Sequence, residues 1–158
     1  MKNHSRCFAT SLIVFLFIGI FAAAGYLYAA EGDKGIQEGK AAIMEGAKKM
    51  MEGNKIIMDT VTKKGKMDAD LTAAGKMMTE GYNMVTKGES MMTGSTMAEG
   101  QTMVKRGSKM MLEAQKKTAD AVEHLGLTYE CSSALDSCKW AEKKINEGAL
   151  EWFFGGGI

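Results

Sequence analysis

Apolar residues return every seven positions along most of the chain. A seven-residue phrase occurs four times between Ile36 and Lys63, as IQEGKAA, IMEGAKK, MMEGNKI and IMDTVTK. A second set runs from Met77 to Met97, and a third from Met103 to Lys116. Because a sustained seven-residue apolar period is typical of long supercoiled helices, the chain is predicted to be all-α.

Glycines lie on the same helical face as the large apolar residues. In the first set the glycines are seven apart, and an Ile or Met follows each of them by four residues. Steps of four and three place both kinds of residue on one side of a helix. Since each glycine costs about 1 kcal/mol of helix propensity relative to alanine, we expect a closely packed neighbouring helix to offset the cost. The predicted packing seam consists of Gly39, Gly46, Gly53, Gly81, Gly88, Gly100 and Gly107.

Breaks in the seven-residue frame predict where the chain turns. Gly65, with lysines on both sides, suits the end of a helix, and Asp68 suits the N-cap of the next one. The frame slips again near Gly94, where Thr96 and Glu99 fit a capping box. The alternative at this second break is one continuous helix with a local irregularity in the supercoil. With the turn, the three predicted long helices span residues 32–64, 68–93 and 96–125.

The composition changes after His124. The repeats stop, aromatic residues become frequent, and two of the three cysteines follow. Ser133 and Asp136 fit another capping box, which predicts a shorter helix over residues 133–150. The expected architecture is therefore a long antiparallel helical hairpin or three-helix bundle with Gly and Met seams, plus a short C-terminal helix. The predicted parts are an N-terminal segment, 1–30, a helical bundle, 31–125, and a C-terminal part, 126–158.

The N-terminal segment has the layout of a secretory signal peptide. Lys2 and Arg6 precede an apolar stretch from Leu12 to Ala24, and the small residues Ala29 and Ala30 follow it. The alternative is an uncleaved membrane anchor, because the 23 residues from position 8 to position 30 are long enough to span a bilayer. We therefore expect an exported protein, periplasmic or extracellular, with N-terminal membrane anchoring as the alternative.

The charge pattern argues against nucleic acid as a partner. After the N-terminal segment, 18 of the 20 basic residues remain against all 19 acidic ones, which gives a net charge of −1. Both signs are interspersed, and no basic patch of the kind that binds phosphate backbones is present. This pattern indicates a solvated surface of mixed charge.

Cys131 and Cys138 lie seven residues apart in the part predicted to be exported. In an oxidising compartment such a pair typically forms a disulfide, which is the state we predict. The alternatives are a metal or haem site and two free thiols. The spacing is not CxxC, and the chain contains no CxxCH.

Methionine is the most frequent large apolar residue of the repeats, and thioethers are soft ligands suited to Cu(I). A site on one helix needs sulfurs three or four residues apart, and no two methionines have that spacing. The rows are therefore interpreted first as an adaptable core or contact surface, with no cofactor. A Cu(I) or Ag(I) site assembled from several helices is the alternative. Its candidate ligands are Met77, Met78, Met84, Met91, Met92 and Met97, with Met67 beside them.

An enzyme is not expected. His124 is the only histidine after the N-terminal segment, no G-x-S-x-G elbow occurs, and the carboxylates alternate with lysines at helical spacing. The expected function is a non-enzymatic one, helix–helix interaction in the cell envelope. The expected partner is an envelope protein or a second copy of the chain.

The aromatic residues near the C-terminus have two interpretations. Trp152, Phe153 and Phe154 form a strongly apolar group just before a glycine-rich end. They either close the open end of the bundle or dock weakly on a membrane or a partner. We expect the first.

Overall fold

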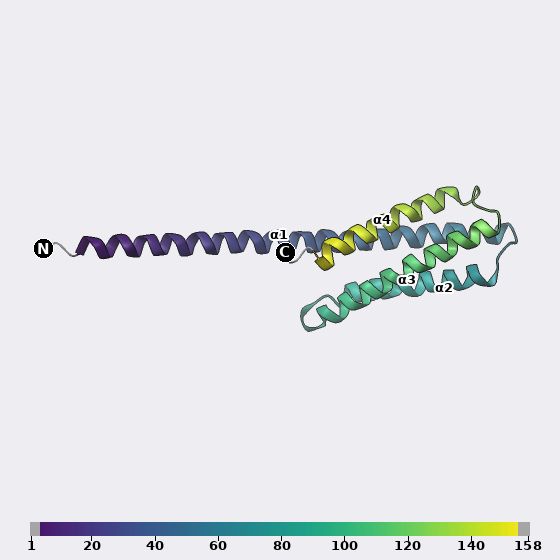
Figure 1. The fold of residues 1–158 in the computed structure, drawn as a ribbon. Helices are drawn as coiled ribbons and strands as arrows, with labels where there is room; N and C mark the ends of the chain where they lie inside the picture. The colour runs from purple at the N-terminus through teal and green to yellow at the C-terminus, as the bar shows by residue number, and fades with distance from the viewer. Residues whose placement is uncertain (1–3, 155–158) are drawn as a thin grey trace.

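The protein is all-helical. A computed structural model describes the backbone of residues 4–154 and the side chains of residues 34–152. Its four α-helices are α1 (His4–Lys63), α2 (Ala69–Ser90), α3 (Met97–His124) and α4 (Ser132–Phe154), and a short 3-10 turn, η1 (Gly94–Thr96), precedes α3 (Figure 1). No strand occurs between residues 4 and 154, so the all-α prediction is confirmed.

The turn between α1 and α2 is built as the sequence predicts. Gly65 has a φ of +65°, and the N–H groups of Gly65 and Lys66 donate to the carbonyls of Thr62 and Val61. These two bonds form a Schellman motif that satisfies the last carbonyls of α1. The carboxylate of Asp68 then accepts a hydrogen bond of 2.7 Å from the backbone N–H of Leu71, which caps α2.

The chain also turns between α2 and α3, at Gly94 with a φ of +57°. The predicted capping box of Thr96 and Glu99 is wrong, however. The Thr96 hydroxyl donates to the carbonyls of Met91 and Thr93, at 2.6 and 2.9 Å, and caps no N–H group of α3. Thr96 lies in the 3-10 turn, with φ −94° and ψ 0°, whereas an N-cap residue needs an extended backbone.

The outer helices differ from the predicted bounds. α1 is continuous from His4 and does not begin at residue 32, while the predicted signal segment, 1–30, lies outside the residues whose side chains are described. α4 has 23 residues and is as long as α2, which has 22. Ser133 lies inside the first turn of α4, so the predicted capping box of Ser133 and Asp136 is wrong as well. The boundaries at residues 30 and 125 stay predictions.

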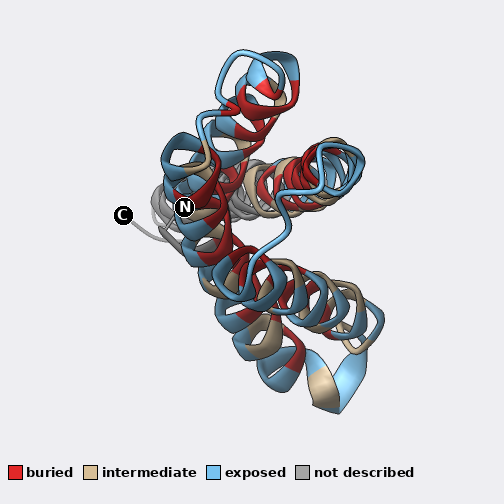
Figure 2. Cartoon of the chain, turned by 90° about the vertical axis from the view of Figure 1, so that its right-hand side faces the viewer, coloured by how far each residue is buried: buried red, intermediate tan, exposed pale blue. Residues whose placement is uncertain are grey.

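The helices pack as two pairs. α1 lies along α4 and α2 along α3, while contacts between the pairs are fewer (Figure 1). Buried residues lie where helices face one another, and exposed residues cover the outside (Figure 2). The expectation of a three-helix bundle with a minor fourth helix is therefore wrong, because α4 is the main partner of α1.

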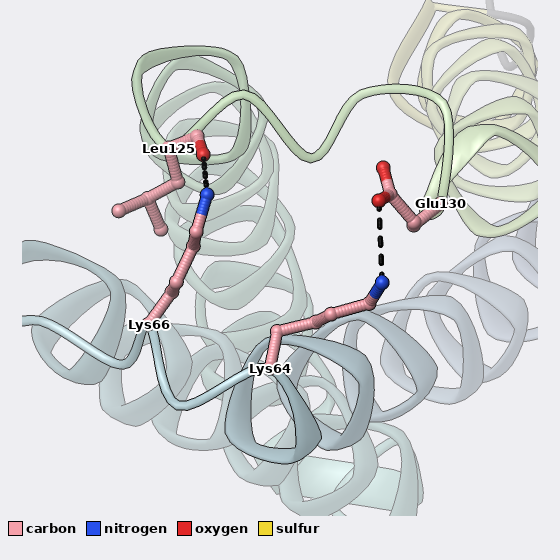
Figure 3. Close-up of polar contacts among 4 residues, drawn as sticks. All are labelled: Lys64, Lys66, Leu125 and Glu130. Carbon is pink, nitrogen blue, oxygen red and sulfur yellow. Dashed lines mark hydrogen bonds and ion pairs between the residues drawn. The ribbon is translucent and has the colours of Figure 1, made fainter.

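Polar contacts join the two pairs. In the interior, the Thr118 hydroxyl of α3 donates to the Asn54 side-chain carbonyl of α1 at 3.2 Å. At one end, the Lys66 ammonium donates to the Leu125 carbonyl at the end of α3, at 2.7 Å, and Lys64 lies 3.4 Å from Glu130 (Figure 3). A backbone N–H and then Lys64 hold the pKa of Glu130 below its usual value. These contacts set how the loop after α1 meets the loop after α3.

Candidate functional site

The glycines of α1 face α4 at very short range. A Cβ added to Gly39 would lie 2.7 Å from the Gly148 carbonyl oxygen. A Cβ added to Gly46 would lie 2.9 Å from the Ala141 carbonyl oxygen. A Cβ added to Gly53 would lie 3.2 Å from the Ala134 carbonyl oxygen and 2.6 Å from the Cys138 sulfur. Three small residues of α1 thus meet three small residues of α4. The pairs are Gly39–Gly148, Gly46–Ala141 and Gly53–Ala134.

The glycines of α2 and α3 meet one another in the same way. A Cβ added to Gly81 would lie 2.9 Å from the Gly107 carbonyl oxygen, and one added to Gly88 would lie 2.6 Å from the Gly100 carbonyl oxygen. In return, a Cβ at Gly107 or Gly100 would lie 2.6 Å from the carbonyl oxygen of Gly81 or Gly88. The two helices therefore approach so closely that the backbone of each occupies the space where the other would carry a side chain.

These distances explain why glycine is used despite its poor helix propensity. Real Cβ atoms do not come within 3.0 Å of a backbone oxygen, so a larger residue would push the helices apart. At this range the α-carbon hydrogens contact carbonyl oxygens of the facing helix, a weak but repeated attraction. Fully buried large residues such as Ile43, Met50 and Val85 flank the glycines. Their burial also contributes to stability, at about 1.5–3 kcal/mol for each side chain.

The residues of α4 that complete the first seam are absent from the predicted site. Ala134, Ala141 and Gly148 alternate at steps of four and three with Cys138, Ile145 and Trp152, all of which are buried. The spacing signal was thus present in the sequence. It was hidden because two of the three small positions are alanine and two of the three large ones are Cys and Trp, which differ from the Gly, Ile and Met of the repeats.

Trp152 belongs to the core of the pair formed by α1 and α4. Its side chain is 5% exposed, and its backbone N and Cβ lie against Gly39. The side chains of Phe153 and Phe154 lie outside the described residues. Within the described part of the C-terminal aromatic group, the tryptophan is therefore packed against α1.

The predicted disulfide is not present. Cys131, directly before α4, and Cys138, within α4, are free thiols, and both are buried in one core cluster. Residues seven apart along a helix are separated by about 10 Å, whereas the Cα atoms of a disulfide lie within about 7 Å. The Cys138 thiol donates weakly to the Met50 carbonyl, with a sulfur–oxygen distance of 3.8 Å. Burial, followed by the nearby Glu130 carboxylate, raises the pKa of Cys131.

We expect the Cys138 thiol to react slowly in the folded protein. Burial raises its pKa to about 11. An unfolded cysteine has a pKa of about 8.5, so near neutral pH the folded protein exposes far less thiolate. Ellman's reagent should therefore label Cys138 much faster in urea than in buffer. Equal labelling rates in the two conditions would rule out a buried, high-pKa thiol.

The same pKa difference predicts a loss of stability at high pH. The folded pKa lies above the unfolded one, so the contribution of the thiol is complete below about pH 8.5. It is lost as the pH rises towards about 11. The free energy of unfolding of a Cys138→Ala variant should fall less across this window than that of the wild type.

The candidate methionine ligands do not form one cluster. Met78 is fully buried, and Met92 packs against the main core. Met97 and Met67 are exposed, at 50% and 38%. Met77 and Met84 of α2 and Met91 at its C-cap are half-buried and seven apart, so the first and last are separated by about 21 Å along the helix axis. The six predicted ligands therefore cannot coordinate a single ion together.

The remaining titratable groups lie mainly on the surface. Exposed side chains four residues apart within the same helix form ion pairs. Examples are Lys34–Glu38 on α1, Lys117–Glu113 on α3 and Lys143–Glu147 on α4. Within the described part of the chain, no group of three His, Cys, Asp or Glu side chains is arranged to hold a metal ion. Among the residues whose side chains are described, which do not include the apolar N-terminal segment, no helix is long and apolar enough to cross a membrane.

Two open grooves separate the helix pairs. One, of about 440 Å³, lies between α3 and α4 and includes Leu112, Gln115 and Leu135. The other, of about 500 Å³, lies between α1 and α2 and includes Met51, Met58 and Gly75. Both grooves carry lysines and acidic residues at their edges, so neither is a purely apolar cleft.

Comparisons with known protein families, with curated proteins and with solved structures find no match. The class is therefore defined by the fold and by the candidate site alone. The protein is a four-helix, all-α protein in which two helix pairs are each joined through small residues.

Proposed function

We propose that the protein is a non-enzymatic, exported helical protein that acts through helix–helix interaction in the cell envelope. The observation that supports this proposal best is the pair of seams. Each seam is a set of small residues seven apart that accepts another helix at backbone contact. The repeat pattern of the sequence thus favours helix association: the Gly positions leave room for the facing helix, and the Met, Ile or Val positions beside them supply the large packed side chains.

Within one chain both seams are filled by the chain's own helices. A partner therefore either contacts the outer faces of the pairs or replaces one helix at a seam. The second mode suits a copy of the same chain, because the same pairs of residues form between two copies as within one. The N-terminal signal pattern supports the envelope as the place of action.

The test is cross-linking in intact cells followed by fractionation. A lysine-reactive cross-linker suits the surface, which carries exposed lysines on every helix. We expect the chain in the envelope fraction, with discrete cross-linked species that are lost in Gly88→Ala. Gly75→Ala, in the same helix but outside the seam, is the control and should keep them. Recovery in the cytosol, or the same species in both variants, would contradict the proposal.

A further inference from the structure

One face of the pair formed by α2 and α3 is lined by methionines from both helices. Each of these side chains is half-buried, and within each helix they lie seven residues apart. Met77 also packs against the main core cluster. We call this surface the methionine face; it consists of Met77 and Met84 of α2, Met91 at the C-cap of α2, and Met103 and Met110 of α3.

The seam contacts place Met84 and Met103 on the same side. A Cβ added to Gly107 would lie 2.9 Å from the Met84 Cβ, and a Cβ added to Gly88 would lie 2.9 Å from the Met103 Cβ. In an antiparallel pair, residues that occupy equivalent positions on the two helices lie on the same flank. Val85 and Val104 occupy the opposite flank, where both are fully buried in the core. Met84 and Met103 therefore lie side by side on the flank away from that core.

The same register brings further methionines together. One step of seven residues along each helix pairs Met77 with Met110 in the way that Met84 pairs with Met103. Successive pairs are about 10 Å apart along the helices. Met91 continues the row on α2. The outer flank thus carries thioethers in pairs that draw one member from each helix.

The other helix pair shows that the seam does not require methionine there. A Cβ added to Gly148 of α4 would lie 2.9 Å from the Ala42 Cβ, which corresponds to the approach of Gly107 to Met84. The matching outer rows contain no methionine. They are Ala42, Lys49 and Ile56 on α1 and Ser137, Lys144 and Glu151 on α4. Two seams of the same geometry thus differ in this flank, so the seam contacts alone do not require methionine at these positions.

The geometry points to a binding site for a soft monovalent metal ion, Cu(I) or Ag(I), at the Met84–Met103 pair, with a second at Met77–Met110. Thioether sulfur is a neutral, soft ligand that selects such ions. Because these side chains are only half-buried, an ion can approach them from solvent. The ligands come from two helices, which is why no spacing within one helix revealed them. This site is separate from the seams on which the proposed function rests.

The test is titration of the purified full chain with Ag(I), with detergent present to keep the apolar N-terminal segment in solution. The chain carries methyl-¹³C methionine, and the methionine methyl NMR signals are recorded at each step. We expect the signals of Met84 and Met103 to shift while those of buried Met78 and Met111 stay unchanged. Shifts confined to other methionines, or no shift at stoichiometric Ag(I), would overturn the inference.

Matched variants give a second measurement. The Met84→Leu/Met103→Leu variant should weaken Ag(I) binding about tenfold or more against a competing chelator, a loss of about 1.4 kcal/mol. The control is Met78→Leu/Met111→Leu, which removes the same number of sulfurs from the core and should bind as the wild type does. All three proteins carry Cys7→Ala, Cys131→Ala and Cys138→Ala, so that none of the three thiols of the chain supplies a ligand. Equal affinity in the two methionine variants would refute the site.

Discussion

Replacing Trp152 with alanine is expected to lower the free energy of unfolding by about 3–5 kcal/mol, the usual cost of removing a buried aromatic side chain. Trp152 is 5% exposed and belongs to the main core cluster. Its backbone N and Cβ fit against Gly39 at the far end of the α1–α4 seam, and alanine keeps both atoms, so the loss comes from the buried ring and not from the Gly39 contact. Urea unfolding followed by circular dichroism measures the change.

The second tryptophan of α4 is a matched control. Trp140 is 41% exposed, and the Lys144 ammonium lies 5.7 Å from its ring centroid. Trp140→Ala removes an exposed cation–π contact, so we expect a loss of only about 0.5–1 kcal/mol. If the two variants lost equal stability, Trp152 would not be packed as described, and its role as a membrane or partner contact would gain support.

Replacing Gly88 with alanine is expected to lower the free energy of unfolding by about 1–3 kcal/mol, as overpacking does in other tightly packed interiors. The added methyl group would lie 2.6 Å from the Gly100 carbonyl oxygen and 2.8 Å from the Val104 backbone nitrogen. Neither atom can move without its helix. The gain of about 1 kcal/mol in helix propensity is therefore outweighed. Thermal unfolding measures both the sign and the size of the change in stability.

The same substitution at Gly75 should have the opposite sign. Gly75 lies in the same helix, and its added Cβ would meet the Met58 terminal methyl at 3.0 Å, which is the end of a flexible side chain. We expect Gly75→Ala to be neutral or to stabilise the protein by up to about 1 kcal/mol. A loss at Gly75 as large as that at Gly88 would mean that glycine is needed for a reason other than the seam.

The sequence predicts the helices well because their signals are local. Gly65 and Asp68 mark a turn whose hydrogen bonds the structure contains, and the seven-residue spacing marks which faces are apolar. The capping box at Thr96 fails because a Ser or Thr followed by Glu or Asp also occurs inside a turn, where the hydroxyl bonds backward to Met91 and Thr93.

Which helices pair with one another was harder to predict, because a row of glycines on one helix does not specify which other helix packs against it. All of the rows share one period, so a seam on α1 fits any helix with small residues seven apart. The choice of α4 depends on Ala134, Ala141 and Gly148, which do not resemble the repeats. The disulfide prediction failed for a related reason: the spacing of seven that places Cys131 and Cys138 in one apolar cluster makes both of them core residues and keeps them free.

The order of the pairs along the chain has a consequence for biosynthesis. α2 and α3 are neighbours in sequence, so their hairpin closes as soon as both have been made, at a small loss of loop entropy. α1 is made first, yet its partner α4 is made last. Until α4 has been synthesised, the face of α1 that carries Gly39, Gly46 and Gly53 lacks the helix that packs against it in the folded protein. The nascent chain therefore has a partly uncovered apolar face for most of its synthesis, which is the kind of surface that chaperones hold.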